Sequence, residues 1–180
     1  MGTLLGNCSV FCYYSYIAPL LTNVSGIPTE MMTLMMVLAG AGMVIGNLSG
    51  GKISDKAGPG HMGRYGVMTM FLMLGIIFFF SHYTIVSVVC MVITTAALFS
   101  VSAPQQLLLL RYSDGGELLG GAMVQIAFNL GNAIGAFAGG IPISLGIEYN
   151  YCALVGIFFA AMALVAYTLF IRRYESRRVS

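Results

Sequence analysis

Long apolar runs follow one another along this chain, and short polar stretches separate them. The expected helical spans lie at about 3–22, 30–50, 64–81, 84–110, 118–145 and 150–172. Each is close to the ~20 residues that cross a bilayer as an α-helix. The runs do not alternate with a period of two, which disfavours a β-barrel. The pattern predicts an all-α, polytopic membrane protein, with one six-helix transmembrane bundle over residues 1–180.

The connections carry turn signals, which place the ends of the spans. Pro28 is typical of a helix start, and Asp114 with Glu117 has the spacing of a capping box. The stretch from Gly50 to Gly63 is rich in glycine and basic residues, and we interpret it as a loop. Because every connection is short, we expect consecutive helices to be antiparallel neighbours.

Composition excludes several classes of protein. Of the 180 residues, 58% are hydrophobic and only 8% are charged, and the mean hydropathy is +0.90. A soluble domain is about one quarter charged, so this chain has too little charge to cover a water-facing surface. A net charge of +2 is also too small for a nucleic-acid-binding protein. We therefore expect the lipid bilayer, and no nucleic acid, as a partner.

The cations fall on one side of the predicted topology. They follow spans two, four and six, and none follows spans one, three or five. The eight are Lys52, Lys56, Arg64, Arg111, Arg172, Arg173, Arg177 and Arg178. By the positive-inside rule, these connections and both termini are expected in the cytoplasm.

The sequence gives little support for a catalytic site or a metal site. Cys8, Cys12, Cys90 and Cys152 lie within or at the ends of apolar spans, and their spacing matches neither a disulfide framework nor a zinc site. No His, Asp or Glu stands at depth beside a nucleophile. We expect no enzyme activity, no metal and no cofactor.

The fifth span carries a polar stripe. Gln125, Asn129 and Asn132 stand at positions i, i+4 and i+7, so they share one helix face near mid-membrane. Carboxamides at this depth are unfavourable unless they are paired or face water. They predict the wall of a solute cavity, and the alternative is that they only hydrogen-bond helices together.

A second face of the same span is built for close packing. Gly131, Gly135 and Gly139 follow at four-residue spacing, which favours close approach of another helix. Pro142 is expected to loosen the outer end of this helix.

Two other spans contribute candidate cavity residues. Asn7, Phe11 and Tyr14 lie on one face of the first span, and Gln105 with Gln106 lies near the cytoplasmic end of the fourth. Amide and aromatic groups on converging helices suit a polyhydroxylated or amphipathic solute. The predicted cavity set is Asn7, Tyr14, Gln106, Gln125, Asn129 and Asn132.

The basic stretch after the second span has a motif of its own. Gly51, Asp55, Lys56 and Gly58 form the pattern G-x-x-x-D-K-x-G, and Arg64 follows. It resembles the loop motif of the major facilitator superfamily, G-x-L-x-D-[RK]-x-G-[RK]. The resemblance implies a cytoplasmic gating loop whose aspartate latches one conformation. The family's second basic run is replaced here by Pro-Gly-His, and the alternative is a loop that only sets topology.

Longer stretches extend the resemblance over essentially the whole chain. Residues 125–140, Gln-Ile-Ala-Phe-Asn-Leu-Gly-Asn-Ala-Ile-Gly-Ala-Phe-Ala-Gly-Gly, resemble helix eleven of the arabinose-efflux-permease-like branch. Residues 14–19, 40–47 and 102–106 resemble helices seven, eight and ten. The resemblance implies helices seven to twelve of a proton-coupled drug or sugar antiporter of the bacterial inner membrane. Its cavity would lie between this bundle and an N-terminal six-helix half, with spans one and four lining it.

Two alternatives remain open at this point. The chain could be a half-size transporter that works as a homodimer, because its cations all lie on one side. It could also be a membrane scaffold that transports nothing.

Overall fold

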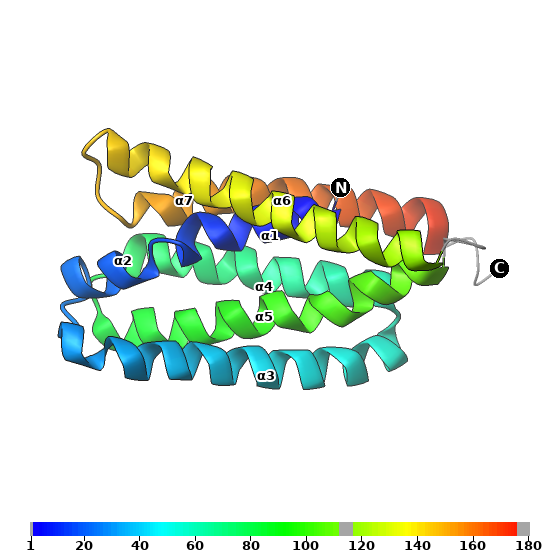
Figure 1. Ribbon diagram of the computed structural model, residues 1–180, viewed down its shortest axis with the longest axis horizontal. Coiled ribbons are helices and arrows are strands. Elements are labelled where there is room, and N and C mark those ends of the chain that lie inside the picture. Colours follow the sequence, from blue (N-terminus) through cyan, green and yellow to red (C-terminus); the bar gives the residue numbers. More distant parts are fainter. Residues whose placement is uncertain (1, 112–116, 176–180) are drawn as a thin grey trace.

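The computed structural model describes residues 2–111 and 117–175, and these form a bundle of long helices (Figure 1). The order is α1 (Gly2–Tyr14), α2 (Ile17–Asn23), the 3-10 turn η1 (Thr29–Met31), α3 (Met32–Ala57), α4 (Pro59–Phe80), α5 (Thr84–Arg111), α6 (Glu117–Ser144), α7 (Tyr151–Phe170) and the π-helical turn η2 (Ile171–Glu175). Six helical segments are long and apolar enough to cross a membrane, with α1 and α2 together forming the first. This confirms the predicted all-α fold class.

The first span is interrupted near its middle. α1 ends at Tyr14 and α2 begins at Ile17. Pro19 has no backbone N–H, so it cannot donate to the carbonyl of Ser15 four residues earlier. The missing hydrogen bond explains why the helix breaks at this point.

The prediction of a loop between Gly50 and Gly63 is wrong. α3 continues to Ala57, only Gly58 is non-helical, and α4 begins at Pro59. Glycines and charges mark the end of the membrane-spanning part of α3, but lysine is a good helix former, so the helix continues beyond it. The expected capping box cannot be compared, because Asp114 lies outside the described residues.

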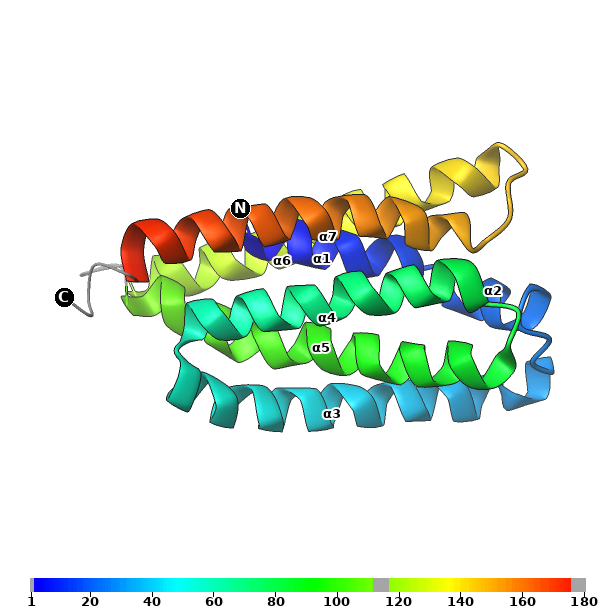
Figure 2. The ribbon, with the colours of Figure 1, turned by 180° about the vertical axis from the view of Figure 1, so that it is seen from behind.

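The helices pack mainly on partners that are not next in the chain. α3 packs chiefly on α5, and α1 chiefly on α6 and α7. α4 packs on α5 and α7, and it links the α3–α5–α4 group to the α6–α1–α7 group. Figure 2 shows α4 and α7 on the face opposite to the one that Figure 1 presents. Consecutive helices were expected to be neighbours. The pairs α3 and α4, α4 and α5, α5 and α6, and α6 and α7 are in contact, but only α4 and α5 pack extensively.

Glycines explain the two closest helix pairs. A Cβ atom at Gly42 would lie 2.7 Å from the carbonyl oxygen of Val92, and Gly46 and Gly50 abut the α5 backbone in the same way. Gly135 abuts the backbone of α1 at Cys8. Both seams place a glycine every four residues against a neighbouring backbone, which is the small-xxx-small geometry.

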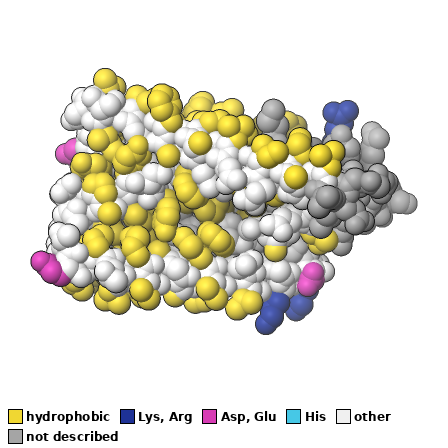
Figure 3. Space-filling view, in the orientation of Figure 1, with side chains coloured by type: hydrophobic (Ala, Val, Ile, Leu, Met, Phe, Trp, Pro, Cys, Tyr) yellow, Lys and Arg dark blue, Asp and Glu magenta, His cyan; other side chains and the backbone are white. Residues whose placement is uncertain are grey.

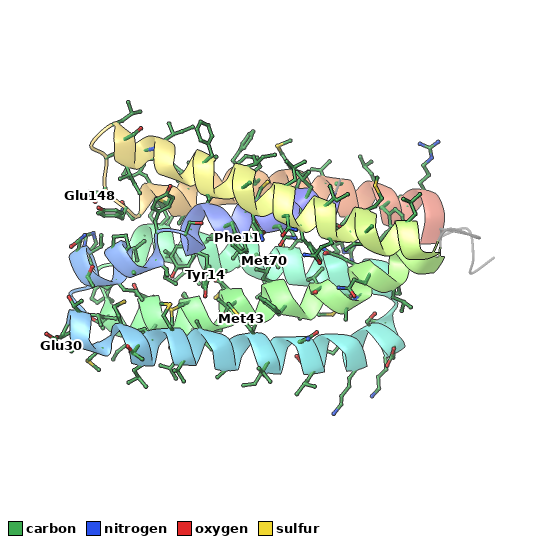
Figure 4. All side chains as sticks on the ribbon, in the orientation of Figure 1. Phe11, Tyr14, Glu30, Met43, Met70 and Glu148 are labelled. Atoms are coloured by element: carbon green, nitrogen blue, oxygen red, sulfur yellow. The ribbon has the colours of Figure 1, made fainter. Side chains whose placement is uncertain are left out.

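Charged and apolar side chains are separated along the bundle. The C-terminal ends of α3, α5 and α7 lie together at one end, with the described cations, while Glu30 and Glu148 lie at the other (Figure 4). Between the ends, apolar side chains face outward, among them Val37, Leu48 and Phe137 (Figure 3). Such a surface suits hydrocarbon, and the chain is a multi-pass membrane protein.

Candidate solute-binding pocket

A pocket of about 260 Å³ opens between α5 and the pair of α1 and α6. α5 packs only lightly on these two helices, which leaves room for the pocket. Its lining is Asn7 and Phe11 of α1, Leu98, Phe99, Ser102 and Gln106 of α5, and Gln125, Phe128, Asn129 and Asn132 of α6. Five of the six predicted cavity residues lie together here, and Tyr14 is not among the lining residues.

The polar wall of the pocket comes from α6. Gln125, Asn129 and Asn132 line it from one stripe of that helix. The adjacent glycine face fixes the distance to α1, because a Cβ atom at Gly131 would lie 2.6 Å from the Leu4 carbonyl oxygen. The two faces of α6 thus serve the pocket and the helix contact respectively.

Glycine and proline positions hold the rest of α6 in place. Gly139 lies against the backbone of Cys12, and Gly140 lies against the Tyr16 hydroxyl. The Tyr16 hydroxyl donates to the Ala136 carbonyl at 2.9 Å. Pro142 lies two residues before the end of α6, and its carbonyl accepts a hydrogen bond from the Ile147 N–H at 3.0 Å.

The amides offer hydrogen-bonding groups to a bound molecule. The Asn7 side-chain N–H donates to the Thr3 carbonyl at 2.9 Å, which leaves the Asn7 side-chain oxygen to accept. The side-chain oxygen of Asn132 is buried and has no hydrogen-bond partner among the described residues. Buried acceptors are normally paired, so this atom has the capacity to accept a hydrogen bond from a molecule in the pocket.

Aromatic rings supply the apolar part of the lining. Phe11 lines the pocket and meets the ring of Tyr14 edge to face, with centroids 5.8 Å apart. Tyr14 lies beside Phe11, nearer the end of the bundle that holds Glu30 and Glu148 (Figure 4). Phe99 and Phe128 also line the pocket and were missed from the sequence. Phe99, Ser102 and Gln106 follow at i, i+3 and i+7 on α5, and Phe128 follows Gln125 by three residues on α6, so the helix period could have identified both rings.

The two adjacent glutamines of α5 have different surroundings. Gln106 lines the pocket, whereas Gln105 is buried and donates to the Tyr167 hydroxyl at 2.6 Å. Gln105 was also a candidate cavity residue, and it does not line the pocket. Gly2 and Gly63 pack against the Tyr167 ring, so this tyrosine joins α1, α4, α5 and α7.

The predicted gating residues surround the junction of α3 and α4. Gly51, Asp55 and Lys56 lie on the last two turns of α3, with both charged side chains exposed, and Gly58 forms the junction. Gly58 has φ +86°, a value that favours glycine. Arg64 lies on α4, with its guanidinium 5.7 Å from the centre of the Tyr65 ring. These residues are clustered at a helical corner, not on a flexible loop.

Comparison with known proteins supports a transport role. "Putative transporter AraJ" of Escherichia coli (strain K12) is 43% identical over 164 residues, which is 90% of this chain. "Inner membrane transport protein YdhP" of the same organism is 35% identical over 92% of this chain. "Uncharacterized MFS-type transporter YfhI" of Bacillus subtilis (strain 168) is 30% identical over 92% of this chain. No family model matches the chain.

These relatives are longer than the chain. The matched region spans 42% of the length of each of the three. Their names describe transporters and no enzyme.

Proposed function

Because this chain belongs to the major facilitator superfamily, we propose that it is the C-terminal half of a secondary active efflux transporter. The pocket between α1, α5 and α6 would be one wall of a central cavity. An N-terminal six-helix bundle of the same transporter would supply the other wall. Rocking of the two bundles would then expose the cavity to each side of the membrane in turn.

The pocket lining is the observation that carries this proposal. Its polar groups are five carboxamides and one hydroxyl, its rings are three phenyl groups, and it contains no charged side chain. Amides suit hydroxyl and amide groups of a solute, and phenyl rings suit an apolar face. The lining therefore favours an uncharged sugar or a drug-like solute over an ion.

The charge distribution supports the proposed setting in a bacterial inner membrane. Cations gather at the end where α3, α5 and α7 finish, and by the positive-inside rule this supports a cytoplasmic position for that end and for both termini. The acids Glu30, Glu148 and Asp55 lie near helix ends. Proton coupling would therefore depend on a carboxylate of the N-terminal half.

The corner between α3 and α4 would act as the cytoplasmic latch. Asp55 and Lys56 are exposed at this corner, and there they would contact the partner bundle. Gly51 and Gly58 would allow close approach of the two halves, and Arg64 would contribute charge. The two helices that meet at Gly58 would hold these groups in fixed positions.

Co-expression with a matching N-terminal half tests the proposal. We expect the pair to export radiolabelled L-arabinose or ethidium from cells, and this chain alone to export neither. Asn129→Ala should raise KM roughly two- to ten-fold, which corresponds to one lost hydrogen bond. Asn47→Ala is the matched control, because Asn47 is an exposed amide on α3 outside the pocket lining.

Other outcomes would favour the alternatives. Export by this chain alone, together with a discrete crosslinked dimer in membranes, would support a homodimeric half-size transporter. No export with any partner, and no solute-dependent change in thiol labelling of the pocket, would support a scaffold. Labelling should use a cysteine placed at Gln125, because Cys8 and Cys12 are fully buried.

A further inference from the structure

A second cavity lies on the other side of α5 from the solute pocket. It has a volume of about 420 Å³ and is bounded by α3, α4 and α5. α3 and α4 both pack on α5 far more than on each other, so a groove remains between them with α5 as its floor. Ala96 and Ser100 lie in this groove, whereas Leu98 and Ser102 face the solute pocket. Side chains two residues apart on an α-helix point in directions that differ by about 200°. The groove therefore opens away from the solute pocket.

The lining of this groove is chemically unlike that of the solute pocket. The hydroxyls of Ser49, Thr69 and Ser100 donate to carbonyls of their own helices, at 2.8, 3.0 and 2.8 Å. The rest of the lining is glycine, alanine, isoleucine, methionine and one tyrosine. These three hydroxyls are already satisfied, and the surface they share is apolar. Hydrocarbon is therefore the matching occupant.

The groove lies in the half of the bundle nearest the cations. Its lining on α3 extends from Gly46 through Ile53, and α3 ends at Ala57. The seven steps from Gly46 to Ile53 rise by about 10 Å. Half of the hydrocarbon core of a bilayer is about 15 Å. The groove can therefore hold the part of an acyl chain that lies nearest its headgroup, at the cation-rich end of the bundle.

Positive charge stands at the mouth of the groove. Lys56 follows Ile53 by three residues, on the same side of α3, and is exposed. The Arg64 guanidinium lies over the ring of Tyr65, which lines the groove. Asp55 is the one acidic neighbour on α3. Figure 3 shows basic side chains at this end of α3, on the edge of the molecule.

We propose that this groove binds an acyl chain of an anionic phospholipid, with the lipid phosphate at Lys56 and Arg64. The apolar lining accounts for the chain, and the two cations account for the headgroup. This site is separate from the solute pocket, and the proposal depends on membrane insertion but not on transport.

Native mass spectrometry of the purified chain in detergent micelles tests the proposal. We expect dioleoylphosphatidylglycerol to be retained about five-fold or more over dioleoylphosphatidylcholine. Replacing both Lys56→Gln and Arg64→Gln should remove this preference, whereas Arg173→Gln should leave it. Thr69→Phe fills the groove and should lower retention of both lipids. Thr168→Phe is the matched control, because Thr168 of α7 is also half-buried and donates to the carbonyl four residues earlier, at 2.7 Å.

Three results would overturn the proposal. These are equal retention of the two lipids by the unmodified chain, equal retention by the Thr69→Phe and Thr168→Phe variants, and displacement of the lipid by glycerol 3-phosphate alone. The last result would mean a surface phosphate site without an acyl groove. If Thr69→Phe loses the helical circular dichroism signal, Ile93→Trp fills the same groove from α5 and decides the outcome.

Discussion

The seam between α1 and α6 makes a prediction about Gly135. A Cβ atom at this position would lie 2.6 Å from the Cys8 carbonyl oxygen and 3.0 Å from the Cys8 Cα. Both are backbone atoms, which cannot rotate away as a side chain can. Gly135→Ala must therefore push α1 and α6 apart by several tenths of an ångström. Overpacking of this kind costs about 1–3 kcal/mol.

A second glycine of the same helix provides the control. Gly121 has no atom within 4 Å of the position its Cβ would take. Alanine is favoured over glycine in a helix by up to about 1 kcal/mol, and this gain applies to both positions. The difference between Gly135→Ala and Gly121→Ala therefore isolates the packing contribution, and we expect Gly135→Ala to be less stable by about 1–3 kcal/mol.

Thermal unfolding in detergent measures this difference. For a chain of this size, 1 kcal/mol corresponds to a change in Tm of about 2–4 °C. Gly135→Ala should unfold about 2–12 °C below Gly121→Ala. Equal Tm values would show that α1 and α6 are not in backbone contact, and the assigned basis of this seam would then be refuted.

Two further predictions concern the cation-rich end of the bundle. Tyr167→Phe removes the acceptor of the buried Gln105 N–H and should destabilise the chain by about 1–3 kcal/mol. In a double-mutant cycle of unfolding, Tyr167→Phe combined with Gln105→Leu should lose less stability than the sum of the two single losses. Gly58→Ala places a side chain at φ +86° and should cost about 1–3 kcal/mol, whereas Gly51→Ala, in open space on α3, should not lower Tm.

The helices were predictable because lipid imposes a strong rule on the sequence. Every span needs a long apolar run, and the six runs gave the six membrane-spanning segments. The junction at Gly58 was not predictable in the same way. Charged and glycine residues end the apolar run at Gly50, but a helix can continue into water when its residues favour it.

The pocket was predictable where the polar residues repeat with the helix period. Gln125, Asn129 and Asn132 form such a stripe, and all three line the pocket. Gln105 and Gln106 could not be separated, because adjacent residues of the same type differ only in what packs against them. The partner of Gln105 is Tyr167, 62 residues away in the chain. No local pattern connects the two.

The pairing of α1 with α6 determines when the bundle can assemble during translation. About 130 residues of chain separate the end of α1 from the end of α6. At translation rates of ~5–20 residues per second, this delay is roughly 7–26 s. During that interval α1 must remain in the bilayer or the insertion machinery without its main neighbours, with Asn7 and Ser9 still to be buried. Assembly of the bundle is therefore completed only after the ribosome has produced α6 and α7.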